Sequence, residues 1–283
     1  MISEKTCFGI IGLGLLGGSY AIALSRKGYR VIGVDVDEAA CQKAIENGWC
    51  EKAGSDPSIL GECDLVISAL YPRTFIQWIR ENQDVLKPGC LLSDVTGVKR
   101  YVISELSRIL RSDVEFIACH PMAGREYKGL DYADPDRFRN ANYIVVPTEN
   151  NTEEAVQTGK QLGEILGFRN IVELDAKKHD EMIGYLSQLT HVIAVSLMNA
   201  NDRTDLAEYT GDSFRDLTRI AFINEDLWPS LFAMNSDLLL SEMDAFIEEM
   251  QSFRSLLAAG DEEGMKQKLR LSSERQQLFR KKK

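Results

Sequence analysis

The stretch CFGIIGLGLLGGS, residues 7–19, decides the fold of this 283-residue chain. Its opening run, Cys7–Ile11, is apolar throughout and predicts a strand that is buried on both faces. A glycine-rich turn follows, and a helical pattern then continues to Arg26. The stretch therefore predicts a strand, a tight turn and a helix, which is the unit that builds parallel α/β sheets.

Three glycines in the turn, Gly12, Gly14 and Gly17, have the spacing G-x-G-x-x-G. The first permits the tight turn, the second lets the backbone approach a pyrophosphate, and the third lets the helix pack closely on the strand. The helix N-terminus, which begins with Leu15 and Leu16, then faces the anion. Placed between a strand and a helix, this spacing predicts a dinucleotide-binding loop of the Rossmann type.

Asp35 closes the second apolar run, Tyr29–Val34, 18 positions after Gly17. A carboxylate at this place accepts hydrogen bonds from a ribose 2′-hydroxyl and repels a 2′-phosphate, so the sequence favours NAD over NADP. No arginine or lysine follows until Lys43. The alternative is a glycine turn with an unrelated aspartate.

The rest of the chain divides into two parts by its hydrophobic pattern. Apolar runs and helical patterns alternate as far as Asp175, and only helical patterns follow. We therefore predict an α/β Rossmann-type domain with a mostly parallel sheet, residues 1–175, and an all-α domain, residues 176–283. The further runs are Leu65–Leu70, Cys90–Ser93, Glu115–Cys119, Tyr143–Val146 and Asn170–Leu174; the helical patterns are Glu38–Asn47, Thr74–Leu86, Arg100–Leu110, Glu153–Leu166, Asp180–Ala200, Leu227–Met250 and a segment from Asp261 to near the end.

Composition narrows the class of protein. Hydrophobic residues make up 44% and charged residues 27% of the chain, which is typical of a globular protein. The formal net charge of -10 argues against a nucleic-acid partner, because phosphates would be repelled. The most apolar stretch is interrupted by polar residues, and the N-terminus lacks the pattern of a secretory leader, so we expect a cytoplasmic protein with no membrane partner.

Metal binding is not expected from the cysteines and histidines. The six cysteines form no C-x-x-C pair, and the chain has only three histidines. Most of the cysteines lie in or beside apolar runs. We therefore expect reduced, buried cysteines and no metal site.

Two loops follow predicted strands at the edge where parallel sheets bind ligands. They are DVTGVK, residues 94–99, and HPMAGRE, residues 120–126. His120 ends its strand and titrates near neutral pH, so it is a candidate base for the hydroxyl proton of an alcohol that loses hydride. The alternative is a capping or packing histidine.

One helix carries a polar stripe on an otherwise apolar surface. Gly184, Gln188, His191 and Val195 share a face at helical spacing. An apolar helix of this kind is buried in a core or between subunits, and the stripe either lines a cleft or forms a satisfied buried pair.

Together these motifs resemble the prephenate and arogenate dehydrogenases of tyrosine biosynthesis. The resemblance covers nearly the whole chain and rests on ordered motifs at family-like spacing. They are GLGLLGGS (12–19), DVTGVK (94–99), HPMAGRE (120–126), SQLTH (187–191), FRDLTRIA (214–221) and Trp228.

The resemblance implies an NAD-dependent oxidoreductase that also decarboxylates its substrate. Such enzymes oxidise a cyclohexadienyl alcohol at ring C4 while the C1 carboxylate departs as CO2. By similarity, His120 takes the C4 hydroxyl proton, Arg219 binds a substrate carboxylate, and His191 contacts the substrate. Glu126 and Asp216 match positions that orient groups near the site. Family members are homodimers through the helical domain.

The chain departs from the family pattern at several site positions. Most relatives have Gly-Ser where this chain has Thr96-Gly97, so Thr96 is the candidate source of the missing hydroxyl. Many relatives have histidine at the position of Gln188, which we expect, like Trp228, to bind substrate. Arg125 follows HPMAG, where a small hydroxyl residue is common, and we expect it to pair with the pyruvyl carboxylate of prephenate. That pairing favours prephenate over arogenate; the alternative is a surface arginine.

Three other functions stay open from the sequence. The first is an arogenate dehydrogenase, whose product is tyrosine. The second is a β-hydroxyacid-type dehydrogenase, which needs a catalytic lysine on a helix of the second domain. Lys177 and Lys178 precede the long predicted helix rather than lie within it. The third is a dinucleotide sensor, which has no need of His120, His191 and Arg219 together.

Overall fold

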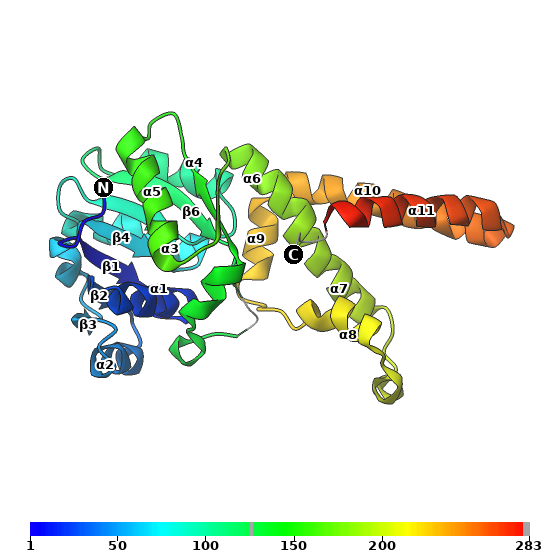
Figure 1. The fold of residues 1–283 in the computed structure, drawn as a ribbon, viewed down its shortest axis with the longest axis horizontal. Coiled ribbons are helices and arrows are strands. Elements are labelled where there is room, and N and C mark those ends of the chain that lie inside the picture. The colour runs from blue at the N-terminus through cyan, green and yellow to red at the C-terminus, as the bar shows by residue number, and fades with distance from the viewer. Residues whose placement is uncertain (125–126, 280–283) are drawn as a thin grey trace. The chain divides into compact units, whose positions relative to one another are not determined.

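A computed structural model of the chain describes residues 1–124 and 127–279 (Figure 1). An eight-stranded sheet has the order β3-β2-β1-β4-β5-β6-β7-β8. All neighbouring strands are parallel except β6 and β7, which are antiparallel. The strands are β1 (Cys7–Ile11), β2 (Arg30–Val34), β3 (Lys52–Gly54), β4 (Leu65–Ser68), β5 (Leu91–Asp94), β6 (Glu115–Pro121), β7 (Asn142–Val146) and β8 (Asn170–Glu173).

Helices connect the strands and make up the described chain after β8. In the first part they are α1 (Leu15–Arg26), α2 (Glu38–Glu46), α3 (Pro72–Asn82), α4 (Arg100–Ile109) and α5 (Glu153–Leu166). The later ones are α6 (Ala176–Ile183), α7 (Thr190–Asn199), α8 (Asp212–Thr218), α9 (Trp228–Met234), α10 (Ser236–Ala259) and α11 (Glu262–Leu278). The expected fold class, a mostly parallel α/β sheet with a helical C-terminal part, is confirmed.

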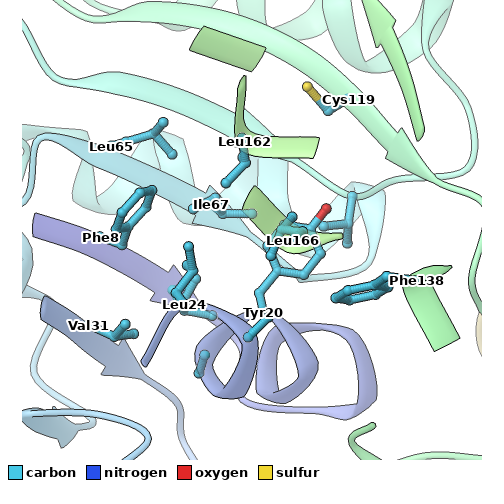
Figure 2. Close-up of a cluster of buried hydrophobic side chains, with 14 of the residues drawn as sticks. Phe8, Tyr20, Leu24, Val31, Leu65, Ile67, Cys119, Phe138, Leu162 and Leu166 are labelled. Atoms are coloured by element: carbon cyan, nitrogen blue, oxygen red, sulfur yellow. The ribbon is translucent and has the colours of Figure 1, made fainter. Parts of the chain in front are cut away.

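The sheet is buried on both faces because its strands carry apolar side chains in both directions. Phe8 and Ile10 of β1 pack into one core cluster, and Cys7 and Ile11 pack into the other. On the first face, Tyr20 and Leu24 of α1 lie in the same cluster as Leu162 and Leu166 of α5 (Figure 2). Residues of α2 also belong to this cluster. Residues of α3 and α4 complete the second cluster. This two-sided burial explains why the strands read as continuous apolar runs.

The local structure differs from the sequence-based predictions in several places. The short edge strand β3 was missed, because three residues show no periodicity. The strand ending at Cys119 runs on to Pro121, so His120 lies within β6 and pairs with Ile144. The segment Leu227–Met250 is two helices, α9 and α10, which are separated at Asn235.

The long helix predicted from Asp180 is interrupted. Gly184–Leu189 forms a π-helical turn between α6 and α7, and such turns often occur at functional sites. The chain divides into two compact units, residues 1–236 and residues 237–283. The domain boundary expected near residue 175 stays a prediction. Within the described ranges, no helix is long and apolar enough to cross a membrane.

Candidate active site

The glycine loop between β1 and α1 is shaped to receive an anion. Gly12 has a φ of 91°, a left-handed conformation that favours glycine. A Cβ on Gly17 would lie 1.8 Å from the carbonyl oxygen of Gly12, so only glycine fits there. Gly14 caps α1 with no side-chain hydrogen bond, and a Cβ on it would meet nothing within 4 Å. The first turn of α1 is therefore open to a ligand, as a pyrophosphate requires.

Asp35 follows β2 and ties the glycine loop to the strand end. Its Oδ2 accepts a hydrogen bond of 2.6 Å from the backbone N of Leu13, and its Oδ1 accepts one of 2.9 Å from Asp37. Each carboxylate oxygen has lone pairs for further donors. The neighbouring Val36 is 93% exposed. The loop and Asp35 thus fit the diphosphate and ribose of a dinucleotide.

A cavity of about 940 Å³ lies beside this loop within residues 1–236. Leu16 of α1 reaches it, whereas Leu15 is buried and does not line it. The cavity brings together five residues that the sequence analysis singled out from segments far apart in the chain. They are His120, Gln188, His191, Arg219 and Trp228.

His120 lines the cavity and begins a chain of hydrogen bonds that runs through His179 to Asp180. Its Nδ1 is 2.9 Å from Nε2 of His179, and Nδ1 of His179 is 2.7 Å from Oδ1 of Asp180. Burial lowers the pKa of His120 well below its ordinary value, and the positive charge of Lys99 acts in the same direction. His120 is therefore neutral at neutral pH and can accept a proton or hydrogen bond.

His179 was missed by the sequence analysis, although it is completely buried behind His120. The adjacent pair His179-Asp180 was the available signal, because a histidine beside a carboxylate at a helix start is suited to orienting another group. The contact between His120 and His179 could not be predicted from the sequence, because the two residues are 59 positions apart.

Lys99 and Asp94 form a fully buried ion pair in the loop that also carries the cavity residues Val95 and Gly97. Their Nζ and Oδ2 atoms are 2.7 Å apart, and both side chains have 0% exposure. Lys99 Nζ also donates to the carbonyl oxygen of Cys119. This pair holds the 94–99 loop against β6.

Thr96 belongs to that buried pair and does not reach the cavity. Its hydroxyl donates to Asp94 and lies 3.2 Å from Lys99 Nζ. The hydroxyl of Thr96 is thus engaged by the protein, and its expected role toward a substrate stays a prediction. Gly97 lines the cavity instead, and a Cβ there would lie 3.9 Å from Nε2 of His120.

His191 and Trp228 form one wall of the cavity. Their ring centroids are 3.8 Å apart, and His191 Nδ1 donates to the backbone oxygen of Ser187 over 2.8 Å. Because a carbonyl only accepts, this bond places a proton on Nδ1. Of the predicted polar stripe, Gln188 and His191 line the cavity, whereas Gly184 and Val195 do not.

Gln188 lines the cavity, but its amide is engaged by the protein. Its Nε2 donates to the backbone oxygen of Leu231 over 2.9 Å, and its Oε1 accepts from Asn235 over 2.8 Å. Only 1% of the residue is exposed. The amide of Gln188 is therefore hydrogen-bonded within the protein, which was the alternative to a cleft-lining stripe. Gln188 still forms part of the wall of the cavity.

Arg219 lies just after α8 and lines the cavity. Asp216, on α8 itself, is exposed and does not line it, so the structure separates these two predicted site residues. Arg125 and Glu126 lie outside the described residues; their neighbours Gly124 and Tyr127 line the cavity.

The cysteines and acidic residues give no candidate metal centre in the described ranges. No group of three or more His, Cys, Asp or Glu side chains is arranged to hold a metal ion there. All six cysteines are free and buried.

The chain is similar to known proteins over most of its length. The model "Prephenate dehydrogenase, nucleotide-binding domain" matches residues 20–172, and "Prephenate dehydrogenase, dimerization domain" matches residues 175–271. The prephenate dehydrogenase of Bacillus subtilis is 29% identical over 267 residues, covering 90% of this chain and 71% of that protein. The cyclohexadienyl dehydrogenase of Zymomonas mobilis is 29% identical over 263 residues, covering 89% and 88%.

Solved structures share the fold. The prephenate dehydrogenase of Aquifex aeolicus, in complex with hydroxyphenyl propionate and NAD+, has a TM-score of 0.88 at 24% identity, covering 98% of this chain and 99% of that one. The arogenate dehydrogenase of Synechocystis has a TM-score of 0.83 at 24% identity, covering 97% and 100%. With two family models matching almost end to end, the chain belongs to the prephenate dehydrogenase family.

Proposed function

We propose that the chain catalyses the NAD-dependent oxidative decarboxylation of prephenate to 4-hydroxyphenylpyruvate in tyrosine biosynthesis. One observation carries the proposal: His120, with its lowered pKa, shares a cavity with Arg219 and with Leu16 beside the open N-terminus of α1. A proton acceptor, a cation for carboxylates and a dinucleotide loop are the groups that the reaction requires.

The cofactor's place follows from the loop. Gly12, Gly14 and Gly17 let the backbone approach the pyrophosphate at α1, Leu15 and Leu16 begin that helix, and Asp35 accepts from the ribose. When bound, NAD supplies the acceptor for the hydride that leaves the substrate ring. A carboxylate at position 35 supports NAD over NADP.

The cavity supports a place for the substrate beside His120. His120 Nε2 accepts the hydrogen bond of the C4 hydroxyl and stabilises the positive charge that develops as hydride leaves C4. The electron pair of the breaking bond between C1 and its carboxylate enters the ring, which becomes aromatic. The hydroxyl oxygen keeps or regains its proton, so the residues end the cycle unchanged.

Other residues bind rather than react. The planar guanidinium of Arg219 suits a carboxylate, and His191 and Trp228 present flat surfaces to the ring. On the basis of their motif alone, we retain Arg125 as a candidate for binding the pyruvyl carboxylate of prephenate. We retain Glu126 as a candidate for orienting groups near the site.

The competing functions can be compared with this arrangement. Lys177 and Lys178 lie in the first turn of α6, are exposed and face Glu181, so neither serves a β-hydroxyacid mechanism in the cavity. Arogenate differs from prephenate only in its side chain and is the second candidate, because a structural relative is named an arogenate dehydrogenase.

The test is NADH formation by the purified chain with NAD and either prephenate or arogenate. We expect turnover with prephenate, and a loss of about 10²- to 10⁴-fold in His120→Asn with NAD affinity retained. Turnover with arogenate alone would reverse the substrate choice. NAD binding without turnover on either compound would support a sensor.

We also propose a homodimer in the cytoplasm. The match to a dimerization domain supports the dimer, as do exposed apolar side chains on α10 and α11 such as Leu240, Met250 and Leu269. Six free cysteines support a reducing compartment. Sedimentation equilibrium of the full chain tests the dimer: a single species of monomer mass would refute it.

A further inference from the structure

The hydrogen-bond chain behind His120 determines which of its nitrogens carries the proton. Asp180 is the fixed end of this chain, because its carboxylate accepts at both oxygens. Oδ1 accepts from the backbone N of Lys99 and Oδ2 from that of Arg100, each over 2.9 Å. Oδ2 also forms an ion pair with the Arg100 side chain. The carboxylate is completely buried and has only acceptors to offer His179.

The protonation of His179 follows from this acceptor. Its Nδ1, 2.7 Å from Asp180 Oδ1, must carry a hydrogen. Burial lowers the pKa of His179, although the hydrogen bond to Asp180 acts in the opposite direction. A neutral imidazole has one proton, so Nε2 of His179 is a bare acceptor.

The proton position on His120 follows in the same way from its contact with His179. Its Nδ1 is 2.9 Å from the bare Nε2 of His179 and must donate to it. The Nε2 of His120 is left with a lone pair, and it lies 3.9 Å from the position of a Cβ on Gly97, a residue that lines the cavity. The lone pair is therefore available to a hydroxyl group in the cavity.

Resting on the function proposed above, we propose that His179 is a positioning residue, oriented by Asp180, which holds His120 in the Nδ1–H tautomer with Nε2 as the acceptor for the substrate hydroxyl. The hydrogen bond from His120 to His179 strengthens as positive charge develops on His120. His179 touches no cavity ligand itself, because it does not line the cavity.

Other charged groups also lie near the pair of histidines. Lys99 Nζ, paired with Asp94 and bonded to the carbonyl of Cys119, opposes a charged His120. Arg100 is bound to Asp180, and His191 and Arg219 line the same cavity as His120. Asp94 and Asp180 both act on His179 through their negative charge, and Asp180 is the acid that accepts its hydrogen bond and keeps its proton on Nδ1.

Two substitutions of His179 separate positioning from packing. In His179→Asn, the amide nitrogen takes the place of Nδ1 and can donate to Asp180, but nothing replaces Nε2. In His179→Gln, the longer side chain can place its carbonyl oxygen near the position of Nε2. We expect kcat to fall by about 10- to 100-fold in the asparagine variant, with KM for both substrates nearly unchanged, because the wrong tautomer of a catalytic histidine is costly. The glutamine variant should recover most of that loss.

The tautomer can be observed directly in the wild-type protein. The chain has three histidines, so long-range proton–nitrogen correlation spectra of ¹⁵N-labelled protein distinguish them all. We expect His120 with hydrogen on Nδ1 and a bare Nε2 at neutral pH, and His120→Asn assigns the signals.

The outcomes are distinct from those of the proposed function. Absence of wild-type turnover counts against that function and leaves the spectra to decide the tautomer. A wild-type His120 with hydrogen on Nε2 would overturn the positioning role. So would equal kcat in the wild type and His179→Asn, or equal losses in the two variants. If the asparagine variant fails to fold, the wild-type spectra still decide.

Discussion

The ammonium of Lys99 lies 2.7 Å from the carboxylate of Asp94, and neither side chain is exposed to solvent. A buried charge needs a partner, and removing one member of such a pair leaves the other unpaired. Lys99→Met should therefore lower the free energy of unfolding by about 3–5 kcal/mol. Urea unfolding measures this, with the exposed Lys177→Met as the matched control. A change below about 1 kcal/mol would show that water or a neighbour compensates Asp94.

The second prediction concerns the open N-terminus of α1. A Cβ on Gly14 meets no protein atom within 4 Å, so Gly14→Ala should fold normally, but the methyl group would occupy space that the pyrophosphate needs. We expect an unchanged melting temperature and an NAD affinity at least about tenfold weaker. Calorimetric titration with NAD measures the affinity. Gly211→Ala, on another open glycine, is the control and should bind NAD as the wild type does.

The third prediction concerns Arg219. A charged hydrogen bond to a carboxylate contributes about 1.5–3 kcal/mol, so Arg219→Ala should raise KM for prephenate by about 10- to 150-fold. NAD affinity should be nearly unchanged. Arg215 of α8, which is exposed and paired with Asp212, is the control one turn before Arg219, and Arg215→Ala should leave KM unaltered. An equal loss of NAD affinity in Arg219→Ala would place this arginine in the cofactor site.

The fourth prediction concerns the small residue at position 97. A Cβ on Gly97 would lie 3.8 Å from Leu231 Cδ1 and 3.9 Å from His120 Nε2, both ordinary contacts. Gly97→Ser should therefore fold and place a hydroxyl beside the reacting group. One added hydrogen bond of about 0.5–1.5 kcal/mol predicts a rise in kcat/KM of about 2- to 12-fold. Gly97→Ala fills the same space without the hydroxyl, and an equal effect there would assign the change to packing.

The fifth prediction is a dependence of stability on pH. Burial lowers the pKa of His120 and His179 in the folded protein, whereas in the unfolded chain both titrate near 6.5. Their contribution to the free energy of unfolding is therefore complete above pH 6.5. It is lost as the pH falls toward the pKa values of the folded protein, because in this range the unfolded chain binds more protons than the folded protein. Each histidine adds a slope of up to about 1.4 kcal/mol per pH unit.

Urea unfolding at a series of pH values checks this dependence. The free energy of unfolding should fall as the solution is acidified below 6.5. His120→Asn removes one of the two groups, so its curve should be shallower. A wild-type curve that is flat through this range would mean that the folded protein protonates both histidines as readily as the unfolded chain.

Much of the fold and part of the site could be predicted from the order of residues alone. The apolar runs with no polar face indicated a buried parallel sheet, and the glycine spacing indicated the turn at α1. Both are local properties, since backbone conformation at Gly12 and the exclusion of a Cβ at Gly17 depend on residues within one turn. The candidate base His120 was likewise evident from its place near a strand end.

Tertiary structure decided what the hydroxyl, amide and imidazole groups contact. Thr96 and Gly97 are neighbours in sequence, yet one side chain is directed at Asp94 and the other position faces the cavity. The chain from His120 to His179 joins residues 59 positions apart, through β6 and α6, which no local pattern encodes. Hydrogen bonds depend on distances of a few tenths of an ångström, whereas hydrophobic periodicity only indicates which face of an element is buried. The candidate proton acceptor was therefore evident in the sequence, but its orientation depends on the packing of α6 against the sheet.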